Sequence, residues 1–276
     1  MSDNIQQHAQ ETLEFLKNKG VKTPKVGVVL GTGLGKFPEH MEVELTIPYS
    51  EIPHFPVATV EFHSGKLLFG TVEGVPVIAM QGRFHYYEGY DMKQLTFPIR
   101  IMKLLGAEFL LLSNAAGAMN LNFKKGDLML ITDHINLQPD TPLRGKNIDE
   151  WGPRFPDMSE AYNTELRNKL KSVAAKHHET MEEGVYVSVP GPMLETPAEY
   201  RFLHRIGADA VGMSTVPEVI VANHMGLPCA AVSVLTDECD PDNLAPVDIE
   251  EIIAVAGKSD AKLSAIFKET IVMLGS

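Results

Sequence analysis

The stretch VPVIAMQGRFHYYEGY, residues 75–90, joins an apolar segment to a dense group of polar and aromatic side chains. The apolar segment, 75–79, contains valine and isoleucine and predicts a strand buried in a sheet. Gly82 ends this strand, and one arginine, one histidine, three tyrosines and one glutamate lie between positions 83 and 90. This mixture is not typical of a core strand, so it indicates either a binding loop or a surface loop with a weak Arg–Glu ion pair.

Four side chains of this stretch have chemistry that suits a ligand. Arg83 presents a planar fork of donors that suits a phosphate or a carboxylate. His85 can donate a hydrogen bond and changes charge near neutral pH. Tyr87 combines an aromatic face with a hydroxyl, which suits a sugar. Glu88 could orient the arginine or a neighbouring histidine.

A glycine-rich turn, Gly31-Thr32-Gly33-Leu34-Gly35, follows a second apolar segment at 26–30. Glycines after a buried strand allow backbone N–H groups to approach an anion closely. The spacing G-x-G-x-G is neither the dinucleotide-binding fingerprint nor a P-loop. The turn alone therefore leaves both an anion site and a plain tight turn open.

Apolar periodicity around these segments predicts an α/β arrangement. Strands are expected at 26–30, 66–71, 75–80, 109–112, 128–133, 185–190, 210–213 and 229–236, and helices at 4–19, 92–105, 160–177, 197 onward, 214–224 and 247–273. The small residues 113–118 are expected to form a turn at a strand end, where open α/β sheets place their ligands. The long loop 134–156, with the only tryptophan, is expected to be functional or interfacial. Without a linker or repeat, residues 1–276 are expected to form a single domain.

The composition excludes several classes of function. A formal net charge of −12 argues against nucleic acid as the main partner, although a few local donors can still bind a small anion. No apolar run of about 18 residues occurs, so no membrane-spanning helix is expected. The polar N-terminus lacks the apolar core of a signal peptide. The two cysteines, Cys229 and Cys239, have no metal-like spacing, which suits free thiols in a cytoplasmic protein.

Six segments, taken in order, resemble the purine nucleoside phosphorylases of the trimeric, low-molecular-mass class. They are 31–35, 81–90, 114–117, 133–137, 191–196 and 207–218. The resemblance implies one α/β domain with a twisted mixed sheet, partly closed into a barrel and surrounded by helices. It also implies a homotrimeric pentosyltransferase of purine salvage, whose partners are a purine nucleoside and phosphate.

The resemblance assigns a role to individual residues of this sequence. The phosphate contacts it implies are Thr32, His63, Arg83, His85, the backbone N–H of Ala115, and Ser214. The nucleoside contacts it implies are Tyr87 and Met213 at the ribose, Leu194, Glu195 and Asp237 at the base, Ile249, and Phe155, which reaches into a neighbouring subunit's site. Glu195 would accept hydrogen bonds from purine N1–H, and Leu194 replaces a stacking phenylalanine.

The implied reaction is phosphorolysis, in which phosphate attacks C1′ while the bond from C1′ to N9 breaks. Phosphate is itself the nucleophile, so neither a covalent intermediate nor a metal or organic cofactor is expected. The protein would position the reactants and stabilise charge, with His85, Glu195 and Asp237 as catalytic residues. A nucleoside-binding module without catalysis is the alternative of a different class, and the complete set of phosphate contacts disfavours it.

Two positions depart from the 6-oxopurine-specific pattern. Asp237 stands where most such enzymes have asparagine, and Ile249 where many have a histidine at the ribose 5′-hydroxyl. An acidic residue near 237, threonine at position 32 and an apolar 5′ pocket are features of methylthioadenosine phosphorylases. Inosine and guanosine remain the expected substrates because of Glu195, with methylthioadenosine or mixed 6-oxo and 6-amino specificity as the alternative. In this interpretation Asp237 works protonated and Glu195 is ionised.

Overall fold

The computed structural model describes residues 4–31, 35–57, 65–244, 246 and 248–275. Its strands are β1 (Val26–Leu30), β2 (Glu42–Pro48), β3 (Lys66–Val72), β4 (Val75–Gln81), β5 (Phe109–Ala118), β6 (Leu128–Asn136), β7 (Met181–Ser188), β8 (Ala210–Gly212) and β9 (Cys229–Glu238). Its α-helices are α1 (Ile5–Asn18), α2 (Met92–Leu104), α3 (Thr164–Lys176), α4 (Pro197–Arg205), α5 (Val216–His224) and α6 (Ile249–Gly275).

The strands form one mixed sheet that closes on itself at one end. Their order is β2-β3-β4-β1-β5-β8-β7-β6-β9, and β5 also pairs with β9 along its whole length. The ring β5-β8-β7-β6-β9 is therefore a closed five-stranded barrel, and β1, β4, β3 and β2 extend from it as an open sheet. This arrangement confirms the predicted fold class of a mixed sheet partly closed into a barrel.

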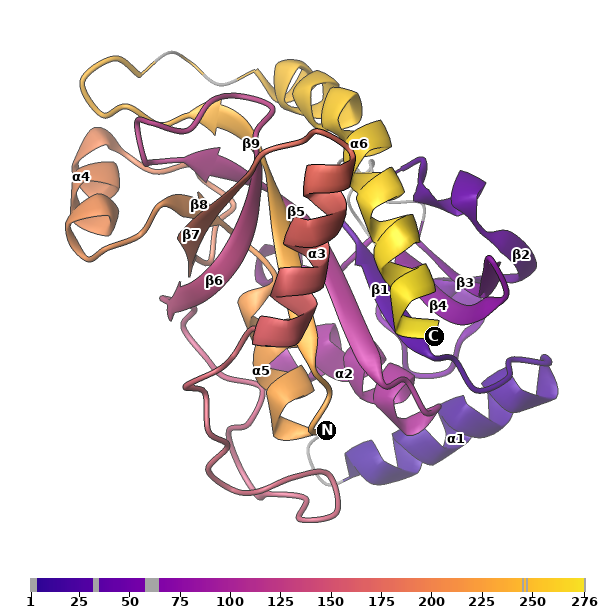
Figure 1. Ribbon diagram of the computed structural model, residues 1–276. Coiled ribbons are helices and arrows are strands. Elements are labelled where there is room, and N and C mark those ends of the chain that lie inside the picture. Colours follow the sequence, from indigo (N-terminus) through magenta and orange to yellow (C-terminus); the bar gives the residue numbers. More distant parts are fainter. Residues whose placement is uncertain (1–3, 32–34, 58–64, 245, 247, 276) are drawn as a thin grey trace.

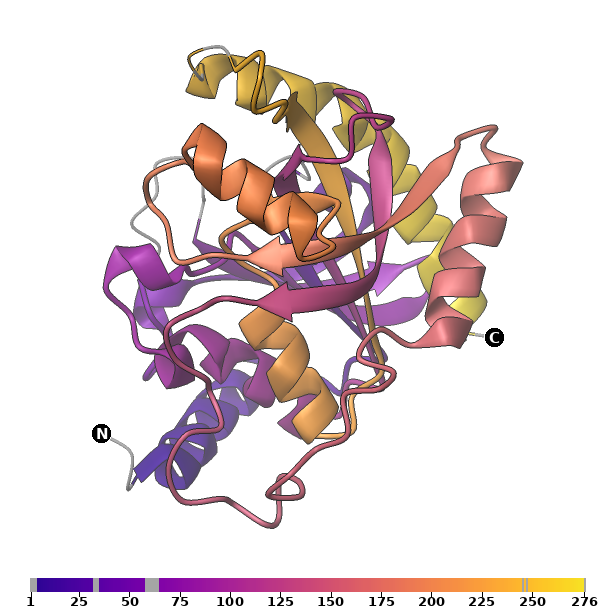
Figure 2. The ribbon, with the colours of Figure 1, turned by 90° about the vertical axis from the view of Figure 1, so that its left-hand side faces the viewer.

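Two groups of helices cover the two faces of the open sheet (Figures 1 and 2). The face with Val26 and Val28 packs against α3 and α6, and the opposite face, with Val29, packs against α1, α2 and α5. All five residues of β1 are buried, because side chains that alternate along this central strand meet helices on both sides. The small helix α4 packs in a separate cluster beside the barrel.

The register of the central strands brings distant segments together at one edge. The parallel strands β4 and β5 flank β1, with Leu30 opposite Gln81 and Val29 opposite Leu112. The residues that follow these positions, Gly31, Gly82-Arg83 and Ser113, therefore lie side by side at the carboxyl ends of the strands. This edge is where ligands bind in open α/β sheets.

Several segments differ from the sequence-based expectation: among them, β7 begins at Met181 and not at 185, and α3 begins at Thr164 and not at 160. Residues 113–118 are the second half of β5 and not a turn, because they pair with β9 and β8 to close the barrel. The strand β2 was not expected, since most of its residues are exposed on the sheet edge and lack an apolar pattern. The strand β6 continues to Asn136, so the long loop begins three residues later than 134. None of the helices in the described part of the chain is long and apolar enough to span a membrane.

Candidate active site

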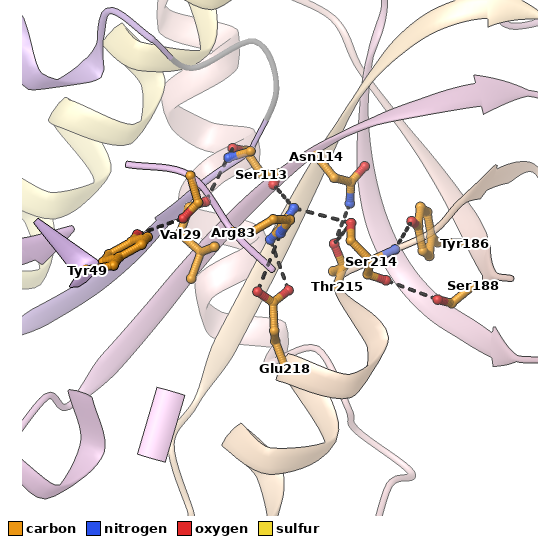
Figure 3. Close-up of polar contacts among 12 residues, drawn as sticks. Val29, Tyr49, Arg83, Ser113, Asn114, Tyr186, Ser188, Ser214, Thr215 and Glu218 are labelled. Atoms are coloured by element: carbon orange, nitrogen blue, oxygen red, sulfur yellow. Dashed lines mark hydrogen bonds and ion pairs between the residues drawn. The ribbon is translucent and has the colours of Figure 1, made fainter. Parts of the chain in front are cut away.

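Arg83 lies at the centre of a buried polar cluster just beyond β4 (Figure 3). Its side chain is almost fully buried, and its Nε and Nη2 donate to the two oxygens of Glu218 at 3.4 and 3.0 Å. Its Nη1 donates to the backbone oxygen of Ser113 and, at 3.3 Å, to Oγ of Ser214. The guanidinium is thus fixed between the middle of β5 and the first turn of α5, which excludes the alternative of a surface loop with a weak ion pair.

The glycine at position 31 allows this cluster to form. A Cβ atom at Gly31 would clash with the backbone oxygen of Ser113 and would lie 3.0 Å from Nη1 of Arg83. The Gly31 N–H donates to the Ser113 hydroxyl at 3.0 Å. The beginning of the glycine-rich turn therefore packs directly against Arg83. Thr32 and His63, two of the predicted phosphate contacts, lie outside the described residues.

Ser214 and Thr215 form a strained, heavily bonded turn at the start of α5. Ser214 donates its backbone N–H to the Tyr186 hydroxyl at 3.3 Å and accepts a hydrogen bond from the Ser188 hydroxyl at 3.1 Å. Thr215 has a φ of 68°, and its Oγ1 accepts from the Asn114 amide at 2.8 Å. Strain of this kind, about 1–3 kcal/mol, persists where surrounding contacts enforce it and is common at functional sites. The turn fixes the Ser214 hydroxyl beside the Arg83 charge at a helix N-terminus, a favourable place for an anion.

The side chain of Asn114 stabilises the turn at Ser214 and Thr215, and its oxygen is a hydrogen-bond acceptor without a partner among the described residues. Its amide nitrogen holds Thr215, as expected for a residue that organises a turn. Its Oδ1 is buried and has no hydrogen-bond partner among the described residues. Buried polar atoms are rarely left unpaired, so a donor from a bound molecule would complete this site.

The remaining residues of the 83–90 stretch form a second cluster. One oxygen of Glu88 accepts from the backbone N–H of His85 at 2.8 Å and contacts its Nδ1 at 2.9 Å. Glu88 therefore orients His85 and not Arg83. The Tyr87 ring stacks on His85 with 4.8 Å between centroids, and burial raises the pKa of Tyr87 to about 12. The tyrosine hydroxyl thus remains a neutral hydrogen-bond donor at physiological pH.

Two carboxyl groups, Glu195 and Asp237, lie close enough for the charge of one to act on the other. Asp237 accepts hydrogen bonds from the Thr236 hydroxyl at 2.9 Å and from the Cys239 thiol at 3.0 Å. Burial raises the pKa of the nearby Tyr200 hydroxyl, and the proximity of Cys239 and Glu195 adds to the rise. Burial raises the pKa of Glu195, and the Asp237 charge adds to the rise. A glycine at position 117 leaves room for the thiol, because a Cβ there would clash with the Cys239 sulfur.

The distribution of protons between the two carboxyls stays a prediction. The sequence suggested a protonated Asp237 beside an ionised Glu195. In the structure both oxygens of Asp237 accept hydrogen bonds, which suits a carboxylate. Burial raises the pKa of Glu195, so this carboxyl loses its proton less readily than an exposed glutamate.

The other predicted contacts in the described residues, one to phosphate and four to the nucleoside, differ in their exposure. Ala115 is half-buried in β5, and Met213 packs against Gly191. Leu194, Ile249 and Phe155 are 41, 52 and 88% exposed. The structure of a single chain thus assembles Arg83 with Ser214, and Glu195 with Asp237, but it leaves Phe155 on the surface.

The residues expected to have no role in the site are mostly placed as predicted. His177, His178 and His204 are exposed, and Met80 and Met129 are buried in the core. The acidic residues after Asp237 differ slightly from expectation: Glu238 and Asp242 are exposed and Asp240 is half-buried.

Sequence reasoning missed Glu218, the counterion of Arg83. Glu218 occupies the third position of α5, and Glu199 occupies the third position of α4. An acidic residue in the first helical turn is common because it suits the helix dipole, so the sequence alone gives no sign that Glu218 is buried.

We expect Glu218→Gln to lower the free energy of unfolding by about 3 kcal/mol or more, because it leaves the buried Arg83 charge uncompensated. Urea denaturation of the purified variant measures this loss. Glu199→Gln is the matched control, since Glu199 is exposed at the same helical position and should lower stability far less. Equal losses in the two variants would show that the Arg83–Glu218 pair has no special importance.

Comparison with known proteins identifies a family. Residues 25–272 match the model of the phosphorylase superfamily. The chain is 46% identical over 271 residues to purine nucleoside phosphorylase 1 of Bacillus subtilis, covering 98% of both chains. It superposes on isoform 2 of Schistosoma mansoni purine nucleoside phosphorylase, solved with cytosine and ribose-1-phosphate, with a TM-score of 0.91, 42% identity and coverage of 96 and 95%. A Schistosoma purine nucleoside phosphorylase solved with hypoxanthine gives a TM-score of 0.90 at 38% identity, with 96% of each chain covered.

Proposed function

The chain belongs to the phosphorylase superfamily as one of its purine nucleoside phosphorylases, and on that premise we propose that its substrates are inosine and guanosine, with their 2′-deoxy forms. The products are the free purine and (deoxy)ribose 1-phosphate. The observation that carries this specificity is the half-buried carboxyl of Glu195 beside Asp237. A carboxylate at this position accepts a hydrogen bond from N1–H, a group that 6-oxopurines have and adenine lacks.

In the proposed mechanism, phosphate binds between the Arg83 charge, the Ser214 hydroxyl and the backbone N–H of Ala115. Thr32, His63 and His85 complete its contacts. Arg83 is fixed by Glu218, so it needs no reorganisation when the anion arrives. One phosphate oxygen attacks C1′ of the ribose, which Tyr87 and Met213 hold, and the electrons of the C1′–N9 bond pass to the purine.

The departing purine needs a proton or a donor near N7, and the carboxyl pair can supply it. We assign one proton to the pair in the active state. It resides on Glu195 when the base site is empty, consistent with the raised pKa of that residue. When a 6-oxopurine binds, N1–H donates to ionised Glu195, and protonated Asp237 donates to N7 as the general acid. The Cys239 thiol donates to Asp237 at 3.0 Å and so adds a hydrogen bond to one member of the pair.

Asp237 also supports a second candidate, a phosphorylase for methylthioadenosine or for both 6-oxo and 6-amino purines. An ionised Asp237 accepts hydrogen bonds and would favour a 6-amino group over the O6 and N7 lone pairs of hypoxanthine. The exposed, apolar Ile249 would suit a methylthio group where a ribose 5′-hydroxyl otherwise binds. Glu195 remains the reason to prefer the 6-oxopurine assignment.

The proposed reaction is tested with inosine and purified protein in the presence and absence of phosphate. We expect hypoxanthine and ribose 1-phosphate in equal amounts, and only when phosphate is present. Base release without phosphate would indicate a hydrolase. No release from inosine or guanosine, under conditions in which methylthioadenosine is cleaved, would establish the second candidate instead.

We further propose a cytoplasmic homotrimer that serves purine salvage, in which Phe155 completes the nucleoside pocket of a neighbouring subunit. Phe155 lies in the long segment between β6 and α3 and is 88% exposed in the single chain. A large aromatic ring at such a position is typical of an interface anchor.

Phe155→Ala should raise KM for inosine about tenfold, the effect of losing one aromatic anchor of about 1.4 kcal/mol, while the trimer persists. Steady-state kinetics and analytical ultracentrifugation measure the two properties. Leu121→Ala is the control, because Leu121 is also exposed, at 56%, and has no role in the proposed pocket. A fully active monomer would contradict the assignment of Phe155.

A further inference from the structure

Asp260 is a buried carboxylate that the proposed mechanism does not use. It lies on the buried face of α6, together with Leu263 and Phe267, and is only 3% exposed. Burial raises its pKa, and the hydrogen bonds that it accepts oppose the rise. A buried carboxylate lowers stability unless other groups satisfy its oxygens, so its contacts indicate what it does.

Each oxygen of Asp260 accepts one hydrogen bond from the described part of the chain. The Ser264 hydroxyl, one turn further along α6, donates to Oδ1 at 2.8 Å. The backbone N–H of Lys36 donates to Oδ2 at 2.9 Å, across a sequence separation of 224 residues. A Cβ atom at Gly35 would lie 3.9 Å from the same oxygen. Asp260 therefore joins α6 to the backbone at Gly35 and Lys36.

Lys36 directly follows the glycine-rich turn 31–35. It precedes the short 3₁₀-helix Phe37–His40, and backbone N–H groups at the start of a helix have no partner within it. Asp260 supplies the missing acceptor. The next residue, Phe37, packs against Phe267 of α6 with 6.4 Å between ring centroids. The helix α6 thus holds the chain where it leaves the turn.

A second side chain fixes the other end of the turn. The Gly31 N–H donates to the Ser113 hydroxyl at 3.0 Å, and Gly31 packs against the guanidinium of Arg83. Ser113 belongs to β5 and Asp260 to α6, so two different elements fix the backbone on either side of residues 32–34, which lie outside the described residues. A backbone segment that is fixed at both ends loses less conformational entropy when it binds a ligand.

We propose that Asp260 is a positioning residue for phosphate, which acts through the glycine-rich turn and not by contact with the ligand. Its carboxylate fixes the end of the turn at Lys36. Without this hydrogen bond that end of the turn would be less ordered, and the entropy lost on ordering it would oppose phosphate binding. The inference rests on the proposed function, in which phosphate binds at Arg83 and Thr32.

Asp260→Ala removes the acceptor of the Lys36 N–H. It should raise KM for phosphate about tenfold, which corresponds to about 1.4 kcal/mol. KM for inosine, and kcat at saturating phosphate, should stay within about twofold of wild type, because only phosphate binding depends on the turn. Isothermal titration calorimetry with inorganic phosphate should show the same weakening without nucleoside. A residue that only stabilised the core would lower the free energy of unfolding and leave the phosphate affinity of the folded protein unchanged.

Two further variants separate this role from a general effect on stability. Asp260→Asn keeps an oxygen for the Lys36 N–H but loses the charge that strengthens the bond, so it should raise KM for phosphate about threefold. This variant decides the matter if Asp260→Ala does not fold. Ser259→Ala is the matched control, since Ser259 is buried in the same helix and its hydroxyl donates to the Gly126 backbone oxygen at 2.9 Å. Its KM for phosphate should stay within about twofold of wild type.

The inference fails if the folded Asp260 variants bind phosphate as tightly as wild type. It also fails if KM for inosine rises as much as KM for phosphate, because the substitution would then disturb the whole site. If wild-type protein bound phosphate but cleaved no nucleoside in its presence, the proposed function would fail instead. The calorimetric titrations would then still decide the role of Asp260, since they need no reaction.

Discussion

Arg83→Ala is expected to lower kcat/KM for phosphate by about 10³-fold, the magnitude typical when a preorganised charged donor is removed from an active site. The substitution removes the positive charge beside Ser214 and the donor to its hydroxyl oxygen. KM for inosine should change much less, because Arg83 is assigned to phosphate and not to the nucleoside. Initial rates with each substrate varied in turn measure the two effects.

The same substitution also leaves Glu218 buried without its counterion, so lower stability could imitate a loss of catalysis. The double variant Arg83→Met/Glu218→Leu separates the two effects. It removes both charges and fills the space with apolar side chains, so it should regain stability but not activity. If folded Arg83→Ala had the same KM for phosphate as wild type, the phosphate site would have been assigned wrongly.

Asp237→Asn is expected to change specificity and pH dependence together. The amide donates to N7 at any pH, so activity on inosine and guanosine should persist and the alkaline side of the pH profile should flatten. In this variant the 6-amino group of adenosine no longer has the Asp237 carboxylate as an acceptor. The adenosine-to-inosine ratio of kcat/KM should therefore fall by about 10- to 100-fold, as expected for a lost hydrogen bond to a charged group.

The acid side of the profile depends on Glu195, whose carboxyl must be ionised to accept N1–H. Burial and the Asp237 charge raise its pKa, so activity on inosine should be lost as pH falls through a value above the ordinary one for glutamate. Asp237→Asn removes one of these causes, so the acid limb should move to lower pH. Glu238→Gln is the matched control, since it removes an exposed charge from the same strand and should leave the limb in place. If the acid limb of the pH profile stayed in place in Asp237→Asn, the Asp237 charge would have no effect on the pKa of Glu195.

The part of the fold that depends on local pattern could be predicted from the sequence. The strand β1 and the hairpin of β3 and β4 were expected within one residue, because continuous apolar segments and the Glu73-Gly74 turn specify them. The capping of α4 by Thr196 was also predicted correctly. These features depend on neighbours in sequence, which periodicity and turn chemistry report directly.

Features that depend on contacts between distant segments could not be predicted in this way. The small residues at 113–118 resemble a turn, yet they form a strand because they pair with β8 and β9. Gly117 leaves space for the sulfur of Cys239, the residue after β9. The stretch 83–90 was recognised as functional, but its arginine pairs with Glu218, 135 positions away. The proximity of Glu195 and Asp237, which are 42 positions apart, likewise depends on the folded chain, and no local pattern reveals it.

The central claim is that Glu195 and Asp237 select a 6-oxopurine nucleoside, and the most direct test is the ratio of kcat/KM among four substrates at saturating phosphate. Wild-type enzyme is assayed on inosine, guanosine, adenosine and methylthioadenosine. Inosine and guanosine are predicted to exceed the other two by about tenfold or more, because only they present N1–H to Glu195. A preference for adenosine or methylthioadenosine by a similar margin would contradict the claim and assign Asp237 to the recognition of a 6-amino group.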